Sequence, residues 1–236
     1  MKVSKSIFPS FITVGNMFCG YMAVIFALVN HNLVWSAWMI VLAAFLDTMD
    51  GKVARLTNSS SQFGVEYDSL ADVVSFGFAP SILIYAFFFK EWNMVGLFIS
   101  FFPLLFGSIR LARFNTKLIG FDKEHFVGLP IPASALSLSG YIILLNTYFP
   151  GRIFPRLLLL LTFLVSILMV SNIRYEKFPR ITFSGSFKKK LISGYITLCF
   201  ILFIAVPQLF LFPIIISYVL SGIVRYPFTA SDKEKK

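Results

Sequence analysis

Long apolar segments recur along the whole chain, separated by short polar breaks, and they constrain the fold more than any other feature. A helix needs about 20 residues to cross the hydrocarbon core of a membrane. Segments of this kind predict eight membrane-spanning helices, at residues 10–30, 33–57, 63–89, 92–115, 131–149, 154–171, 191–206 and 208–224. The last two are short and separated only by Pro207, so a second interpretation is one hairpin that does not cross fully.

The composition agrees with a protein embedded in a membrane. Of the 236 residues, 57% are hydrophobic and 29 are Phe. The polar stretches between the apolar segments are too short to hold a soluble domain. We therefore expect an all-α, polytopic integral membrane helical bundle of about eight transmembrane helices, forming a single membrane domain over residues 1–236.

Basic residues lie mostly at the ends of the apolar segments and give the chain a net charge of +10. An even number of spans puts both termini on one side, and that side holds every Lys and Arg except Lys90, Arg152 and Arg156. The positive-inside rule places this side at the cytoplasmic face of the cell membrane. The same charges fit contact with anionic membrane lipid. Because they do not alternate with aromatics on a soluble surface, we expect no nucleic-acid partner.

Four carboxylates, Asp47, Asp50, Asp68 and Asp72, interrupt the second and third spans. On a helix, residues three or four apart share a face, so the acids form two pairs. A turn at residues 57–62, rich in Asn and Ser, would fold the helix that carries Asp68 and Asp72 back beside the helix that carries Asp47 and Asp50. The two pairs would then meet. Like charges gather at low dielectric only where cations bridge them. Sites made of carboxylates alone bind hard cations such as Mg²⁺, Mn²⁺ or Ca²⁺.

The acids lie within the membrane boundary. The apolar stretch Leu33–Leu46 is too short to cross alone, so its helix must continue through the first two acids to about Arg55. Intramembrane acids mark either a catalytic site or a cation path, so a phosphoryl-transfer enzyme and a membrane cation transporter are both hypotheses. The outer halves of spans two and three, Leu33–Phe45 and Ile82–Phe89, offer almost no polar residues for a path. This favours an enzyme with a lipid substrate.

Residues 47–72 read Asp-x2-Asp-Gly-x2-Ala-Arg-x8-Gly-x3-Asp-x3-Asp. This pattern resembles the signature of the CDP-alcohol phosphotransferase family, in which a CDP-linked donor gives its phosphatidyl group to an alcohol and CMP leaves. The resemblance implies two divalent cations, Mg²⁺ or Mn²⁺, with Ca²⁺ as a substitute in a crystal. It also implies that Asp47 and Asp68 contact both ions, Asp50 the first and Asp72 the second.

The resemblance further implies a site for the donor, CDP-diacylglycerol, at Asn16, Asp50, Gly51, Ala54, Arg55, Ser61 and Gly64. The two glycines and the alanine would let the donor approach the helix backbone closely. Arg55 offers a bidentate fork to a phosphate. Ser61 matches a position where the family contacts the CDP-lipid. Asn16 would either contact the nucleotide or form a buried hydrogen bond between helices.

Four further blocks, 68–81, 110–115, 128–133 and 171–175, resemble the phosphatidylserine synthase branch of the family. This likeness implies L-serine as the acceptor, with a sister enzyme using glycerol 3-phosphate or inositol phosphate as the alternative. It implies a catalytic core of six helices over about residues 8–175. Residues 176–236 would add a basic loop, a C-terminal helix pair and a short tail. We also expect a homodimer.

Serine carries a carboxylate, and arginine is the side chain best suited to a planar, bidentate anion. Arg110 and Arg113 lie three apart at the cytoplasmic end of span four, and Arg174 is a weaker candidate. The alternative for the first two is that they reach up to lipid headgroups as membrane anchors. A serine hydroxyl also needs a positioned proton acceptor, and we assign that role of catalytic base to Asp72.

Overall fold

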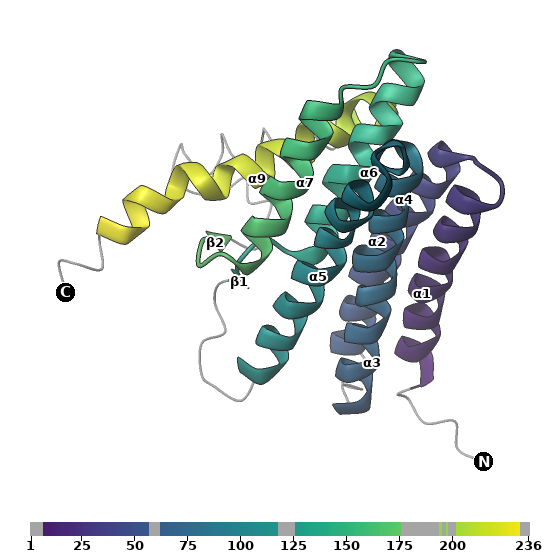
Figure 1. The fold of residues 1–236 in the computed structure, drawn as a ribbon. Helices are drawn as coiled ribbons and strands as arrows, with labels where there is room; N and C mark the ends of the chain where they lie inside the picture. The colour runs from purple at the N-terminus through teal and green to yellow at the C-terminus, as the bar shows by residue number, and fades with distance from the viewer. Residues whose placement is uncertain are drawn as a thin grey trace.

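The computed structural model describes residues 7–56, 62–117, 126–175, 194, 197 and 202–231. Its α-helices (Figure 1) are α1 (Ile7–Leu28), α2 (Leu33–Leu56), α3 (Gln62–Asp72), α4 (Ala79–Phe87), α5 (Asn93–Lys117), α6 (Ile131–Tyr148), α7 (Pro155–Val170) and α9 (Pro207–Ser231). A π-helix, η1 (Val73–Phe78), joins α3 to α4, and a 3-10 helix, η2 (Phe89–Trp92), precedes α5. In these ranges the only strands are β1 (Phe126–Val127) and β2 (Arg174–Tyr175), which pair antiparallel. The all-helical prediction is confirmed apart from this two-residue pairing.

Five helical stretches in the described ranges are long and apolar enough to cross a membrane: Phe11–Leu28, Leu33–Val53, Phe63–Phe87, Phe89–Thr116 and Pro207–Val224. They bear out a polytopic membrane bundle. Two other expected spans coincide with α6 and with α7, which is apolar but only 16 residues long. The expected span 191–206 lies largely outside the described residues. The count of eight spans and the side of the termini therefore stay predictions.

Helix α6 lies at the centre of the bundle and contacts α2, α4, α5, α7, α9 and η1. Twelve of its residues are buried, among them Ser134, Ser137 and Ser139. A helix that other helices enclose on most sides needs no apolar face toward lipid, so it can carry these serines. The serines also lower the mean hydropathy of α6, which explains why this helix is absent from the five stretches that are long and apolar enough to cross a membrane.

Helices α1 and α2 form an antiparallel pair, and the π-helix η1 packs against α1. The close approach occurs at Gly20, where an added Cβ would lie 2.5 Å from Ser75 Oγ and 2.7 Å from Ser75 Cα. The Ser75 hydroxyl also donates a hydrogen bond of 2.9 Å to the carbonyl oxygen of Asn16. These contacts fix the helix that carries Asp68 and Asp72 against α1. In Figure 1 the C-terminal end of α2 and the start of α3 lie at the same end of the bundle as the start of α1.

Candidate active site

Three carboxylates from two helices gather toward the end of the bundle where α1 begins and α2 ends. Asp47 and Asp50 share a face of α2, and Asp68 lies on α3, which packs against α1. Each contributes one oxygen to a group in which all the atoms lie within 4.8 Å of one another. The predicted turn between α2 and α3 therefore brings Asp68 close to Asp47 and Asp50, which precede it in the sequence by 21 and 18 residues.

The surroundings of these acids fit a divalent cation. Asp50 is 5% exposed, and one of its oxygens accepts a 3.0 Å hydrogen bond from the Thr13 hydroxyl of α1. Buried oxygens of Asp68 and Asp72 have no hydrogen-bond partner among the described residues. Buried acceptors without donors are costly unless a ligand satisfies them. A donor set of carboxylates alone suits a hard cation such as Mg²⁺ or Mn²⁺.

Asp72 occupies a different position from the other three acids. It is 9% exposed and lies outside the group whose oxygens approach within 4.8 Å. It remains within electrostatic range of all three and of Arg110 on α5. It is also the last residue of α3, so the wider π-helical turn begins directly after it. Such π-helical turns occur often at functional sites. Asp72 is therefore within electrostatic range of both the carboxylate group and the buried Arg110.

The structure separates the two arginines of α5. Arg110 is 8% exposed, its Nε has no hydrogen-bond partner among the described residues, and it faces Asp72 electrostatically. Arg113 instead donates hydrogen bonds to the carbonyl oxygen of Val170 (2.7 Å) and to the side-chain oxygen of Asn172 (3.4 Å). Arg113 thus ties α5 to the end of α7 and to Asn172 just beyond it. Of the pair, Arg110 is the one whose charge acts on Asp72.

The other predicted donor-site residues are placed unevenly. Asn16 is fully buried, and neither polar atom of its side chain has a partner among the described residues, so the predicted helix–helix hydrogen bond is not observed there. An added Cβ at Gly51 would meet no atom of the described residues within 4 Å. Gly64 lies on α3, one turn before Asp68.

Some predicted residues cannot be placed in the site. The backbones of Ala54 and Arg55 belong to α2 and that of Arg174 to β2, but the side chains of these three residues lie outside the described part of the structure. Ser61 lies wholly outside it. Their roles therefore stay predictions.

Three features were not predicted from the sequence. The Thr13 hydrogen bond to Asp50 and the π-helix after Asp72 are two of them. The third is Tyr218 of α9, which lies within electrostatic range of Arg110. Thr13 lies three residues before Asn16, so the helical period could have assigned both to one face. No sequence signal marks the π-helix, because its six residues read as ordinary apolar helix.

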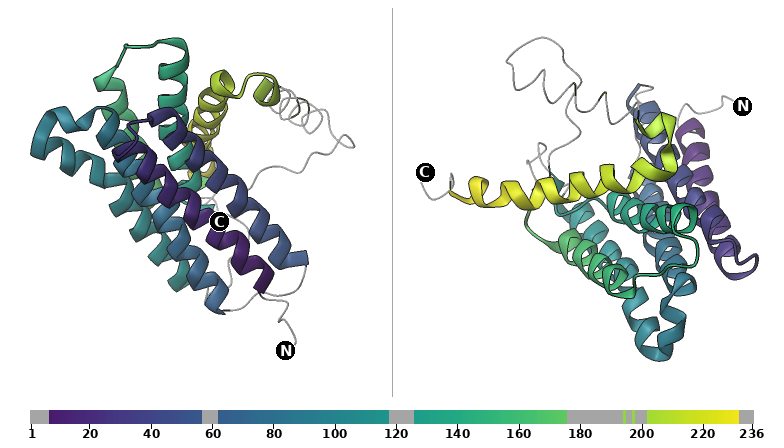
Figure 2. Two further views of the ribbon diagram at one scale, coloured as in Figure 1. Left: turned by 90° about the vertical axis from the view of Figure 1, so that its right-hand side faces the viewer. Right: turned by 90° about the horizontal axis from the view of Figure 1, so that it is seen from above.

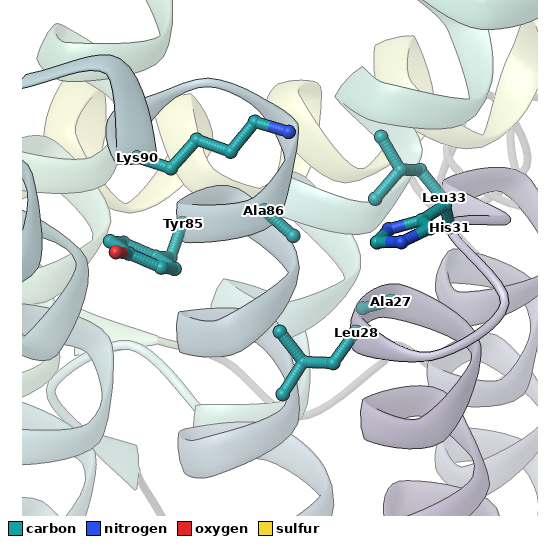
Figure 3. Close-up of a pocket in the computed structure, with 7 residues that line it drawn as sticks. All are labelled: Ala27, Leu28, His31, Leu33, Tyr85, Ala86 and Lys90. Atoms are coloured by element: carbon teal, nitrogen blue, oxygen red, sulfur yellow. The ribbon is translucent and has the colours of Figure 1, made fainter.

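A separate pocket of about 220 Å³ lies at the opposite end of α1 and α2 (Figure 3). It is lined by Ala27, Leu28, His31, Leu33, Tyr85, Ala86 and Lys90. His31 adopts a left-handed backbone conformation with φ of 52°, at the turn between the two helices. None of the four aspartates lines this pocket, so it is not the place where they act.

Comparison with known proteins agrees with this geometry. Residues 6–172 match the family described as CDP-alcohol phosphatidyltransferase. A protein of Helicobacter pylori is 40% identical over 74% of this chain and 74% of its own length. One from Methanocaldococcus jannaschii is 35% identical over 92% of each chain, and one from Bacillus subtilis 37% identical over 73% of this chain and 91% of its own. All three are named CDP-diacylglycerol–serine O-phosphatidyltransferase.

The chain therefore belongs to the CDP-alcohol phosphatidyltransferase family and is a membrane enzyme. The predicted family is confirmed. Membership of an enzyme family decides against the cation-transporter hypothesis. The matched residues end before α9, which the family description does not cover.

Proposed function

We propose that this enzyme transfers the phosphatidyl group of CDP-diacylglycerol to the hydroxyl of L-serine and so makes phosphatidylserine and CMP. The observation that carries the proposal is the buried Arg110 beside Asp72, next to three clustered carboxylates. A cation for the acceptor, a proton acceptor and a metal-binding group thus lie together. The names of the relatives, which cover up to 92% of this chain, support serine as the acceptor.

In the proposed reaction Asp72 accepts the proton of the serine hydroxyl. The hydroxyl oxygen then forms a bond to the phosphorus that carries the diacylglycerol, and the bond from that phosphorus to the bridging oxygen breaks. CMP leaves with the electron pair. Two divalent ions, Mg²⁺ or Mn²⁺, would supply stabilisation of the negative charge on the phosphoryl oxygens and the leaving group. Asp47, Asp50, Asp68 and Asp72 are the residues that would hold them.

The remaining residues bind and orient the two substrates. We assign the CDP part of the donor to Asn16, Gly51, Ala54, Arg55, Ser61 and Gly64, with Asp50 shared with the metal site. Two observations on the described residues support this assignment: the side chain of Asn16 has no hydrogen-bond partner among them, and none of them would meet an added Cβ at Gly51. For the carboxylate of serine we favour Arg110 and keep Arg174 as a second candidate, while the Arg113 bonds to α7 favour a structural role.

The charge pattern of the chain supports a location for the enzyme. We propose a cell-membrane enzyme with both termini and the active site at the cytoplasmic face, where serine and a CDP headgroup have access. The acids lie on α2 and α3, the two helices that the predicted cytoplasmic turn at 57–62 connects. We further propose one membrane domain with a catalytic core at residues 8–175, contacts to anionic lipid, and a homodimer.

The second candidate function is a sister enzyme that uses glycerol 3-phosphate or inositol phosphate. Purified protein supplied with CDP-diacylglycerol, Mg²⁺ or Mn²⁺ and one alcohol at a time distinguishes them through CMP release. Release with serine alone supports the proposal. Release with a phosphorylated alcohol but not with serine contradicts it.

A further inference from the structure

Helix α9 lies beyond the residues that match the family, yet it is packed onto the catalytic bundle. It runs across the bundle instead of alongside α1 and α2 (Figures 1 and 2) and contacts α6 and β2. The ring of Phe212 lies 5.7 Å from that of Tyr141 on α6. Further along α9, the carbonyl oxygen of Val219 accepts a 3.2 Å hydrogen bond from the Tyr175 hydroxyl of β2. The position of α9 on the bundle is thus fixed at both points.

Tyr175 is the main contact between β2 and α9. It is 1% exposed, and a Cβ at Gly222 would overlap its ring. Burial, together with the nearby Tyr218, raises the pKa of Tyr175 to about 12, so its phenol stays protonated and donates to Val219. Tyr218 precedes Gly222 by four residues and shares its helix face. The ring centroids of Tyr218 and Tyr175 lie 5.6 Å apart, so Tyr218 packs against Tyr175.

Tyr218 also interacts electrostatically with Arg110. It lies within electrostatic range of the Arg110 guanidinium, whose other such neighbour is Asp72. Arg110 is buried, and its Nε has no hydrogen-bond partner among the described residues. An arginine has many rotamers, and a bidentate contact to a carboxylate requires one fixed orientation of its planar group. Tyr218 is placed to favour such an orientation.

We propose that Tyr218 is a positioning residue, whose phenol oxygen orients Arg110 toward the acceptor and thereby sets the affinity for the carboxylate of serine. The inference rests on the proposed function and deepens it, because it gives α9 a part in acceptor selection. The competing interpretation is that Tyr218 only packs its ring against Tyr175. Tyr218→Phe separates the two, since it keeps the ring and removes only the hydroxyl.

The test measures CMP release by purified enzyme with serine and CDP-diacylglycerol varied in turn. We expect Tyr218→Phe to raise the serine KM roughly two- to tenfold, the range of one net hydrogen bond. The KM for CDP-diacylglycerol and the melting temperature should stay at their wild-type values. Tyr148→Phe is the matched control, because Tyr148 is an exposed tyrosine at the end of α6 and should change none of these quantities.

A double-mutant cycle adds a measurement that does not depend on the size of the single effect. In an Arg110→Lys background, Tyr218→Phe should raise the serine KM less than it does alone, because the group it orients has changed. An unchanged serine KM in Tyr218→Phe overturns the inference, as does an equal rise in both KM values or a fully additive cycle. If wild type releases CMP only with another alcohol, the proposed function fails. Tyr218 is then judged by the KM of that alcohol in the same variants.

Discussion

The separation of Arg110 from Arg113 gives the sharpest prediction about substrate choice. Both arginines lie on α5, but Arg110 is buried facing Asp72, whereas Arg113 hydrogen-bonds the end of α7. A charge-assisted hydrogen bond contributes roughly 1.5–3 kcal/mol, or about ten- to hundredfold in affinity. We therefore expect Arg110→Ala to raise the serine KM by about that factor. The KM for CDP-diacylglycerol should change little, because the donor is assigned to other residues.

The assay is CMP release at saturating CDP-diacylglycerol over a range of serine concentrations. Arg110→Lys should restore only part of the affinity, because it keeps the charge but loses the planar fork. Arg113→Ala is the matched comparison on the same helix. It loses the bonds to Val170 and Asn172, so we expect a lower melting temperature and a serine KM near the wild-type value. An equal rise in serine KM for the two alanine variants, or no rise for Arg110→Ala, would refute the reasoning.

Three further predictions follow from the acids and the helix packing. Asp72→Asn should keep the affinity for the CDP-lipid but lose turnover, because it removes the proton acceptor. If binding assays and rate assays show equal losses, Asp72 is chiefly a metal ligand. Chelation with EDTA should abolish CMP release and Mg²⁺ or Mn²⁺ should restore it; activity that persists in EDTA would contradict the metal site. Gly20→Ala should lower the free energy of unfolding by about 1–3 kcal/mol, and with it the melting temperature, because the added methyl group overpacks against Ser75. Gly15→Ala should change neither quantity, because among the described residues its Cβ would approach only Leu46 Cδ1, at 3.4 Å.

The long apolar segments and the aspartate spacing were enough to predict the helical bundle and the meeting of Asp47, Asp50 and Asp68. The pairing of the acids on a helix face follows from local periodicity, since three- and four-residue spacings fix which side chains share a face. The meeting of the two helices followed from the turn predicted at 57–62. The lengths of the apolar runs located the spans that face lipid. They could not identify the central helix α6 as enclosed by its neighbours, because burial by other helices has no length signature.

Which arginine faces the acids was not predictable from the sequence. Arg110 and Arg113 are three apart and share a helix face, and their different partners depend on how α5 packs against α3 and α7. The contribution of Tyr218 was hidden for a similar reason. It lies 108 residues after Arg110, on a helix without a motif, and its electrostatic interaction with Arg110 depends on how α9 crosses the bundle.

The most direct test of the central claim supplies isotopically labelled serine and CDP-diacylglycerol to purified enzyme and detects the lipid product by mass spectrometry. We expect labelled phosphatidylserine and CMP in equal amounts from the wild type with Mg²⁺ or Mn²⁺. Asp68→Asn should give neither product, because it removes a carboxylate from the clustered group. Labelled lipid from Asp68→Asn at the wild-type rate, or CMP release by the wild type without labelled phosphatidylserine, would contradict the account.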